Sequence, residues 1–121
     1  MTGQDLSAAA MGREPPLVDV RDVARMVLFG IEEPEKADGQ RYLTAGAWGP
    51  MQAIADILRK AYPELKDTIQ VGSPGGGYLE GYKFPPEYYV DTSKALETPG
   101  VAWIPFEKTV LDTAETFKLL L

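Results

Sequence analysis

Three consecutive glycines, Gly75-Gly76-Gly77, could do chemistry, because the backbone N–H groups of glycine-rich turns can bind phosphate. A dinucleotide-binding turn needs the spacing G-x-G-x-x-G between a strand and a helix, and a P-loop needs glycine followed by lysine and by serine or threonine. Neither pattern is present, and an acid, Glu80, follows where phosphate would bind. We therefore expect a surface loop that continues irregularly to Pro86.

Asp19 and Asp22, with Arg21 between them, could be interpreted as a catalytic pair of carboxylates with the arginine as electrophile. Helix capping explains them more simply. Asp19 precedes a helical repeat of apolar residues, and Asp22, three residues later, has the spacing of a capping box. Arg21 would complete a local ion pair, so we expect all three side chains to be structural.

Composition excludes several classes of site and partner. The chain has no histidine and no cysteine, which removes the commonest general base, the commonest metal ligand, the thiolate nucleophile and disulfides. The formal net charge of -6 argues against nucleic acids and anionic membranes as partners. No apolar run approaches the ~18 residues of a membrane span, and no signal-peptide pattern is present. We expect a soluble, cytoplasmic protein without a metal site.

The stretch from Leu17 to Ala24 organises the rest of the chain. Leu17 and Val18 predict a short strand, which leads directly into a helix capped by Asp19. Arg21, Arg25 and Glu32 should face water. The opposite side of this helix should be buried, and its apolar series consists of Val20, Val23, Ala24, Val27, Leu28 and Ile31.

The remaining pattern indicates a single domain over residues 1–121, with no internal repeat. Residues 1–14 are expected to be a frayed terminus or the tail of a helix. Pro50 should occupy the first position of a second helix. Further strands are expected at residues 40–44 and 68–71, an extended piece at 88–90, and helices at 50–62, 92–97 and 106–121. The apolar sides of the two long helices would be formed by Met51, Ile54, Ala55, Leu58, Ala61 and Tyr62, and by Phe106, Val110, Ala114, Phe117 and Leu121.

The order of these pieces resembles the C-terminal part of an extended short-chain dehydrogenase/reductase, of the NAD-dependent epimerase/dehydratase family. The similar branch contains NADPH-dependent aldehyde and ketone reductases like dihydroflavonol reductase. The resemblance covers nearly the whole chain but only the final third of such an enzyme. It is carried by V-D-V-R-D-V-A at 18–24, G-Q-R-Y-L-T at 39–44, A-I-A-D-I-L at 53–58, Y-P-E-L at 62–65 and V-D-T-S-K-A at 90–95.

The resemblance implies an α/β fold reduced to its substrate-binding portion, with few short strands and three main helices and without the Rossmann core. The full-length enzymes act on carbonyl substrates with NADPH bound at a glycine-rich turn. This chain has no such turn. We therefore expect no cofactor in this chain alone and no cofactor-binding residues.

Catalysis in the family uses a tyrosine and a lysine spaced Y-x-x-x-K on one helix, where the lysine lowers the phenol pKa from about 10. Tyr62 and Lys66 have this spacing. Pro63 breaks the helix between them, so the two side chains need not share a face. We therefore predict that the pair is a coincidence and that the chain has no catalytic residues.

Aromatic residues after the glycines are the candidates for substrate binding. Tyr78, Tyr82 and Phe84 are the residues we select, while Tyr88 and Tyr89 belong to the same cluster. Burial in a core is the alternative for such residues. In the family the corresponding loop can border the substrate entrance, which leaves a role as a lid open.

The first functional hypothesis is a truncated reductase-like protein that contributes the substrate-binding part of a carbonyl-reducing enzyme and is inactive alone. The alternative is a non-catalytic binding or regulatory module that pairs with a full-length relative. An enzyme of unrelated chemistry is disfavoured by the absence of histidine and cysteine. Expected partners are a small carbonyl substrate and either a second copy of the chain or a Rossmann-containing relative.

Overall fold

The structure is a computed structural model that describes residues 16–74, 90–98, 100 and 102–118. This part of the chain is mostly helical and contains one sheet of two strands. Its elements are β1 (Pro16–Leu17), α2 (Val20–Glu32), α3 (Pro34–Ala37), β2 (Ala47–Trp48), α4 (Met51–Ala61), the 3-10 helix η1 (Pro63–Leu65), α5 (Ser93–Leu96) and α6 (Phe106–Lys118). The three main helices expected from the sequence are therefore α2, α4 and α6.

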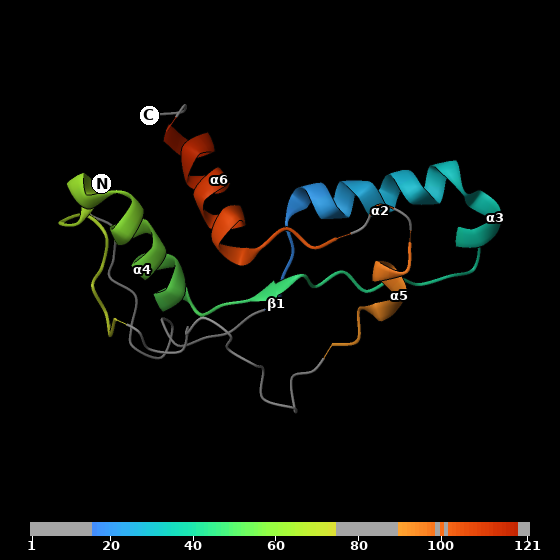
Figure 1. The fold of residues 1–121 in the computed structure, drawn as a ribbon, viewed down its shortest axis with the longest axis horizontal. Coiled ribbons are helices and arrows are strands. Elements are labelled where there is room, and N and C mark those ends of the chain that lie inside the picture. Colours follow the sequence, from blue (N-terminus) through green and yellow to red (C-terminus); the bar gives the residue numbers. More distant parts are fainter. Residues whose placement is uncertain (1–15, 75–89, 99, 101, 119–121) are drawn as a thin grey trace.

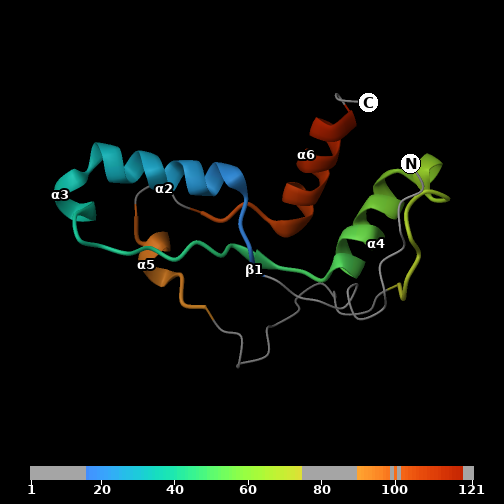
Figure 2. The ribbon, with the colours of Figure 1, turned by 180° about the vertical axis from the view of Figure 1, so that it is seen from behind.

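The described elements form two groups on either side of the short sheet. Helices α4 and α6 lie at one end, and α2, α3 and α5 lie at the other (Figure 1). The view from behind shows the same separation (Figure 2). The apolar core lies between α4 and α6 and consists of Ala53, Ile57, Phe106 and Val110. Leu17 of β1 packs against this core, so the sheet joins the two groups.

The sheet is smaller than the sequence pattern predicts. β1 and β2 pair antiparallel, with Pro16 opposite Trp48 and Leu17 opposite Ala47. The strands expected at residues 40–44 and 68–71 are absent, and both predictions are wrong for the described chain. A strand requires a neighbour for its backbone groups. Within the described part, no backbone N–H or C=O of residues 41–45 has a partner.

Helix α2 begins as the sequence predicts. Asp19 is its N-cap, and the Asp19 carboxylate accepts a hydrogen bond of 2.9 Å from the backbone N–H of Arg21. The capping-box prediction for Asp22 is wrong. Its side chain turns away from the helix start and is fully buried, where it binds Arg25 and the backbone of Ile104.

The burial predicted for the apolar side of α2 is also wrong. Val20 is 77% exposed, Val27 58% and Ile31 70%. The opposite side of the helix contacts the rest of the molecule, where Phe29 packs edge-on against Tyr42 at 5.6 Å between ring centroids. Periodicity correctly located the helix and its aliphatic side, but the described part of the chain leaves most of that side exposed.

Helices α4 and α6 follow the predicted ranges, with changes at their ends. Pro50 is the N-cap of α4 and not its first residue. Ala55 and Tyr62 are buried as predicted, whereas Met51 is exposed. A Cβ atom added at Gly49 would collide with the ring of Phe106, so glycine at this position lets α6 approach the start of α4.

The predicted side of α6 is buried only at its N-terminal half. Phe106 and Val110 belong to the core, Ala114 is half-buried, and Phe117 is 61% exposed. The small helix expected at 92–97 corresponds to α5. The strand-like piece at 88–90 and the end of the last helix fall mostly outside the described residues.

Candidate functional site

Four side chains join the start of α2 to α6, and we call them the Asp19 cluster: Asp19, Arg21, Thr109 and Asp112. Arg21 holds the Asp19 carboxylate with two hydrogen bonds, from Nε at 2.8 Å and from Nη2 at 2.7 Å. The Thr109 hydroxyl donates to Asp19 Oδ2 at 2.9 Å. Arg21 Nη1 lies 2.7 Å from Asp112 Oδ2. The predicted structural role of Asp19 and Arg21 is confirmed, and the ion pair extends to a second helix.

The Asp19 cluster strongly favours ionised carboxylates. The hydrogen bonds from Arg21 hold the pKa of Asp19 well below its usual range, although burial of Asp19 opposes this effect. Lys108 and then Arg21 lower the pKa of Asp112 in the same way. A general acid or base needs a pKa near the working pH, and these carboxylates are shifted away from it. The cluster therefore fits a scaffold for α2 and α6 and not an acid–base site.

The side chain of Gln52, in α4, holds the chain that follows η1, shortly before residues 75–89. Its side chain is 3% exposed and makes three hydrogen bonds. Nε2 donates to Val71 O at 2.9 Å and to Asp56 Oδ1 at 2.8 Å, and Oε1 accepts from the Ser73 N–H at 2.8 Å. Both hydrogen-bonding sides of the amide are used, so the path of residues 71–73 is set by one buried side chain.

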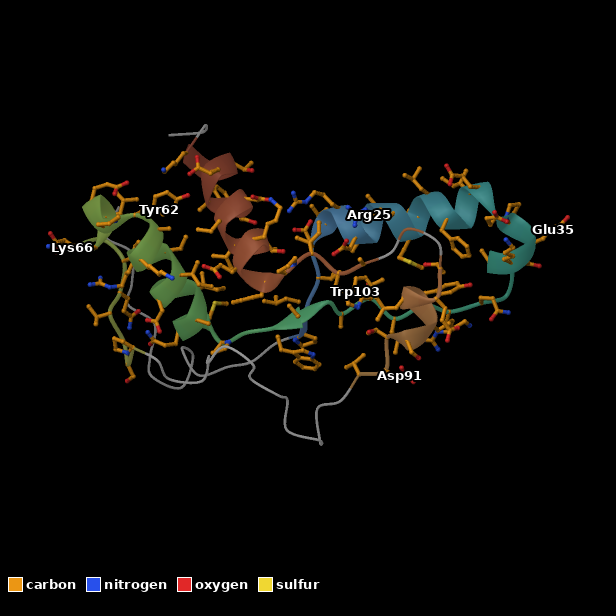
Figure 3. All side chains as sticks on the ribbon, in the orientation of Figure 1. Arg25, Glu35, Tyr62, Lys66, Asp91 and Trp103 are labelled. Carbon is orange, nitrogen blue, oxygen red and sulfur yellow. The ribbon has the colours of Figure 1, made fainter. Side chains whose placement is uncertain are left out.

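A second contact fixes the chain after residues 75–89. Trp103 Nε1 donates to the Thr92 hydroxyl at 3.3 Å, and Asp91 Oδ1 accepts from the Ser93 N–H at 3.0 Å (Figure 3). A Cβ atom at Gly46 would lie 2.9 Å from the Trp103 Cβ, so this glycine allows the indole to lie against the extended chain. The described residues that flank positions 75–89, Val71 and Ser73 on one side and Thr92 on the other, are thus held by hydrogen bonds.

Tyr62 interacts with α6 and not with Lys66. Its hydroxyl donates to Glu115 Oε1 at 2.5 Å, and Lys118 Nζ lies 3.8 Å from the centre of its ring. Figure 3 shows Tyr62 on the side of α4 toward α6 and Lys66 at the outer edge of the molecule. The hydrogen bond to Glu115 raises the pKa of Tyr62, which is opposite to the shift that a proton-donating phenol near neutral pH requires.

The residues selected from the sequence for substrate binding, Tyr78, Tyr82 and Phe84, lie outside the described residues, as do the three glycines. Sequence reasoning missed Gln52, because one polar residue in an amphipathic helix is normally assigned to the solvent side. It also missed the tertiary contacts of Asp22. The only available signal for Asp22 was its capping-box spacing, which suggested a local partner.

An apolar groove of about 350 Å3 lies between β1, α4 and α6. The groove is lined by Leu17, Val18, Ile54, Leu58, Phe106, Thr109, Val110, Thr113, Ala114 and Phe117.

The described residues contain no group of three or more side chains able to hold a metal ion. None of the described helices has the length and apolar content needed to cross a bilayer.

Curated proteins similar to this chain are NADPH-dependent reductases and oxidoreductases. It is 34% identical over 97 residues to the NADPH-dependent methylglyoxal reductase of Saccharomyces cerevisiae, a match covering 80% of this chain and 27% of that protein. A putative NADPH-dependent methylglyoxal reductase of Candida albicans is 30% identical over 96 residues, covering 79% of this chain and 27% of the relative. The chain therefore spans 27% of the length of these two relatives. No family model matches it.

Solved structures give a consistent result. The structure of yeast methylglyoxal/isovaleraldehyde reductase complexed with NADPH superposes with a TM-score of 0.68 at 30% identity, over 88% of this chain and 33% of that one. A reductase engineered to attenuate substrate inhibition in asymmetric catalysis gives a TM-score of 0.69 at 28% identity, over 85% of this chain and 29% of that one.

Proposed function

We propose, from the premise that this chain belongs to the extended short-chain dehydrogenase/reductase family, that it supplies the substrate-binding part of an NADPH-dependent carbonyl reductase. The observation that carries the proposal is the 34% identity with a methylglyoxal reductase over 97 residues. The superposition on the yeast methylglyoxal/isovaleraldehyde reductase supports it. The substrate is then a small aldehyde or ketone.

The described residues do not fit a dinucleotide cofactor. The N-terminus of α2 is capped by the carboxylate of Asp19, which would repel a pyrophosphate. At the start of α4, the ring of Phe106 fills the space beside Gly49. The overall charge of -6 also disfavours a polyanionic ligand. We therefore derive no catalytic step for this chain alone, and its contribution would be to bind and orient the substrate.

Tyr78, Tyr82 and Phe84 are the proposed substrate contacts. The anchors at Gln52 and Trp103 support this assignment, because they hold both ends of the segment that contains the three aromatic residues. Binding residues are often located on loops positioned by a rigid scaffold. Single alanine substitutions at these positions should raise the KM for the carbonyl substrate in a reconstituted enzyme more than they lower kcat.

The test is reconstitution in two pieces. This chain is co-expressed with the N-terminal, cofactor-binding part of the yeast methylglyoxal reductase, and NADPH oxidation with methylglyoxal is followed by absorbance. Activity should require both pieces, and each piece alone serves as the control. No activity from the mixture would count against the proposal. Saturable NADPH binding by this chain alone, abolished by Tyr62→Phe or Lys66→Ala, would show that the dismissed pair is the real site.

The alternative function, a non-catalytic module that pairs with a full-length relative, is favoured by one observation. The aliphatic side of α2 is exposed over the whole length of the helix. Adding this chain to an intact methylglyoxal reductase separates the two possibilities. A change in the activity or oligomeric state of the intact enzyme would favour the module, and an unchanged enzyme would favour the substrate-binding part.

A further inference from the structure

One buried amide on α4 holds two backbone groups of the chain that follows the helix, and we call this arrangement the Gln52 clamp. Gln52 Nε2 donates to Val71 O at 2.9 Å, and Gln52 Oε1 accepts from the Ser73 N–H at 2.8 Å. Nε2 also donates to Asp56 Oδ1 at 2.8 Å. Because the Asp56 carboxylate requires a donor, the amide has one orientation, and it presents both a donor and an acceptor to the backbone.

Gly72, between the two held groups, has a backbone conformation that favours glycine. Its φ is +58°, in the left-handed region. The chain turns at this residue, so the groups on either side of it reach the same side chain. Ser73 is followed by Pro74, which has no N–H, and the Ser73 N–H is therefore the last backbone donor that the structure describes before residue 75.

A second side chain of α4 holds the same stretch further upstream. Arg59 Nη1 donates to Ile69 O at 2.7 Å and also to Lys66 O. Gln52, Asp56 and Arg59 are spaced by four and three residues, so they share one side of the helix. The hydrogen bonds from Gln52 and Arg59 to the chain after η1 all reach backbone atoms, and they fix its path whatever side chains it has.

We propose that Gln52 is a positioning residue for Tyr78 and acts on substrate binding through the clamp, without touching the substrate. This inference rests on the proposed function, in which Tyr78 contacts the carbonyl substrate. Tyr78 follows Ser73 by five residues, so the covalent chain allows its Cα to lie at most ~18 Å from the clamp. Such a limit raises the effective concentration of the aromatic side chain near the site.

Loss of the clamp would relax this limit. The contact of Arg59 with Ile69 would remain, and Ile69 is nine residues before Tyr78, which allows ~32 Å. The volume open to Tyr78 would grow about sixfold, because it scales with the cube of the reach. The hydrogen bond at Thr92 does not compensate, since Thr92 is 14 residues after Tyr78. The KM should therefore rise severalfold, while kcat for the bound substrate stays nearly the same.

Phe84 provides an internal comparison. It lies 11 residues after Ser73 but 8 residues before Thr92, so the hydrogen bond from Trp103 to Thr92 limits its position more closely than the clamp does. The clamp should therefore matter for Tyr78 and much less for Phe84. A general loss of stability would not distinguish these two residues.

Two variants disrupt the clamp by different routes. Gln52→Met removes the amide but keeps the length of the side chain and its preference for a helix. Val71 and Ser73 are exposed, so water can replace the lost hydrogen bonds. Gly72→Ala disfavours the left-handed backbone that brings both groups to the amide. Ser73→Ala is the matched control, because it removes only the hydroxyl and leaves the N–H that the clamp uses.

Amide hydrogen exchange on this chain alone measures the clamp directly, after circular dichroism has shown that the variants retain the helix content of the parent. The Ser73 N–H should exchange roughly tenfold faster in Gln52→Met, as expected for the loss of one hydrogen bond. Ser73→Ala should retain the protection of the parent at this position. Equal exchange in the parent and in Gln52→Met would overturn the inference.

Steady-state kinetics then measure the positioning role in the reconstituted enzyme, by NADPH oxidation with methylglyoxal. Gln52→Met and Gly72→Ala should each raise the KM about sixfold, with kcat within about twofold of the parent. Ser73→Ala should change neither constant. Gln52→Met should add little when Tyr78 is already replaced by Tyr78→Ala, and should keep its full effect when combined with Phe84→Ala.

The outcomes separate this inference from the proposed function. A parent mixture without activity would reject the proposed function, and this inference with it. An active parent whose KM is unaffected by Gln52→Met would preserve the proposed function and overturn the positioning role. Equal effects of Gln52→Met in the Tyr78→Ala and Phe84→Ala backgrounds would overturn it as well, as would a loss of kcat at unchanged KM.

Discussion

The carboxylate of Asp22 accepts a hydrogen bond of 2.8 Å from the backbone N–H of Ile104, a residue 82 positions later in the chain. The other carboxylate oxygen lies 2.8 Å from Arg25 Nη1. Asp22 is fully buried, whereas the Arg25 side chain is 44% exposed. One side chain in the first turn of α2 therefore fixes the segment that leads into α6, and the arginine compensates the buried charge from the solvent side.

Asp22→Ala should destabilise the chain by roughly 1–3 kcal/mol, because it leaves the Ile104 N–H without its acceptor. Urea unfolding followed by circular dichroism measures the change. Asp22→Asn should cost less, since the amide oxygen can still accept from Ile104. Asp38→Ala is the control: this exposed carboxylate has no partner among the described residues and should shift stability by less than about 0.5 kcal/mol. Equal effects at both positions would contradict the role assigned to Asp22.

The buried valine of α6 and the exposed valine of α2 should respond differently to the same change. Val110 is 8% exposed in the core, so Val110→Asp should cost several kcal/mol. Val27 is 58% exposed, so Val27→Asp should change the free energy of unfolding by less than about 0.5 kcal/mol in the isolated chain. Thermal unfolding of both variants beside the parent provides the comparison. A large loss for Val27→Asp would mean that its side chain is covered in solution.

Stability should fall in acid because of the Asp19 cluster. The pKa of Asp19 is lowered in the folded chain, chiefly by Arg21, relative to about 3.9 for an unfolded aspartate. Its contribution to stability is therefore complete above the unfolded pKa and is lost as the pH falls through the folded pKa. Chemical unfolding between about pH 6 and about pH 2 should show this loss, and Asp19→Asn should reduce the slope.

The phenol of Tyr62 should titrate above the usual tyrosine value of about 10. Glu115, which accepts its hydrogen bond, disfavours the phenolate. The difference between the alkaline absorbance titrations of the parent and of Tyr62→Phe isolates this residue from the other tyrosines. Glu115→Gln should bring the transition down in pH. A phenol that ionises below the usual value would instead support the reading of Tyr62 and Lys66 as a catalytic pair.

Local signals in the sequence located the helices, whereas the long-range contacts were not predictable. The repeat beginning at Val20 and the cap at Asp19 depend on neighbouring residues, and both appear as predicted. The burial of Val27 depends on what packs against it, and the described chain leaves its side chain 58% exposed. The strand expected at 40–44 failed for the same reason, since the backbone groups of residues 41–44 have no pairing partner in the described chain.

The candidate site was predicted less well than the fold. Gln52 and Trp103 act on residues about 20 and 11 positions away, through single hydrogen bonds that leave no periodic pattern. The Tyr62–Lys66 spacing is instead a sequence pattern that corresponds to no contact in the structure. It has the pattern of a catalytic pair, but the tyrosine is bound to Glu115, 53 residues further along the chain. Spacing alone could not show that α6 contains the partner of Tyr62.

The anchors at Gln52 and Trp103 also bear on which substitutions the described chain tolerates. Ser73 and Thr92 are held by contacts to α4 and to a residue before α6, and none of these contacts involves the apolar core. Loss of either anchor should therefore leave the packing of α4 against α6 intact. Helix α4 thus has two separable tasks, since Ala53 and Ile57 support the core while Gln52 sets the path of the following chain.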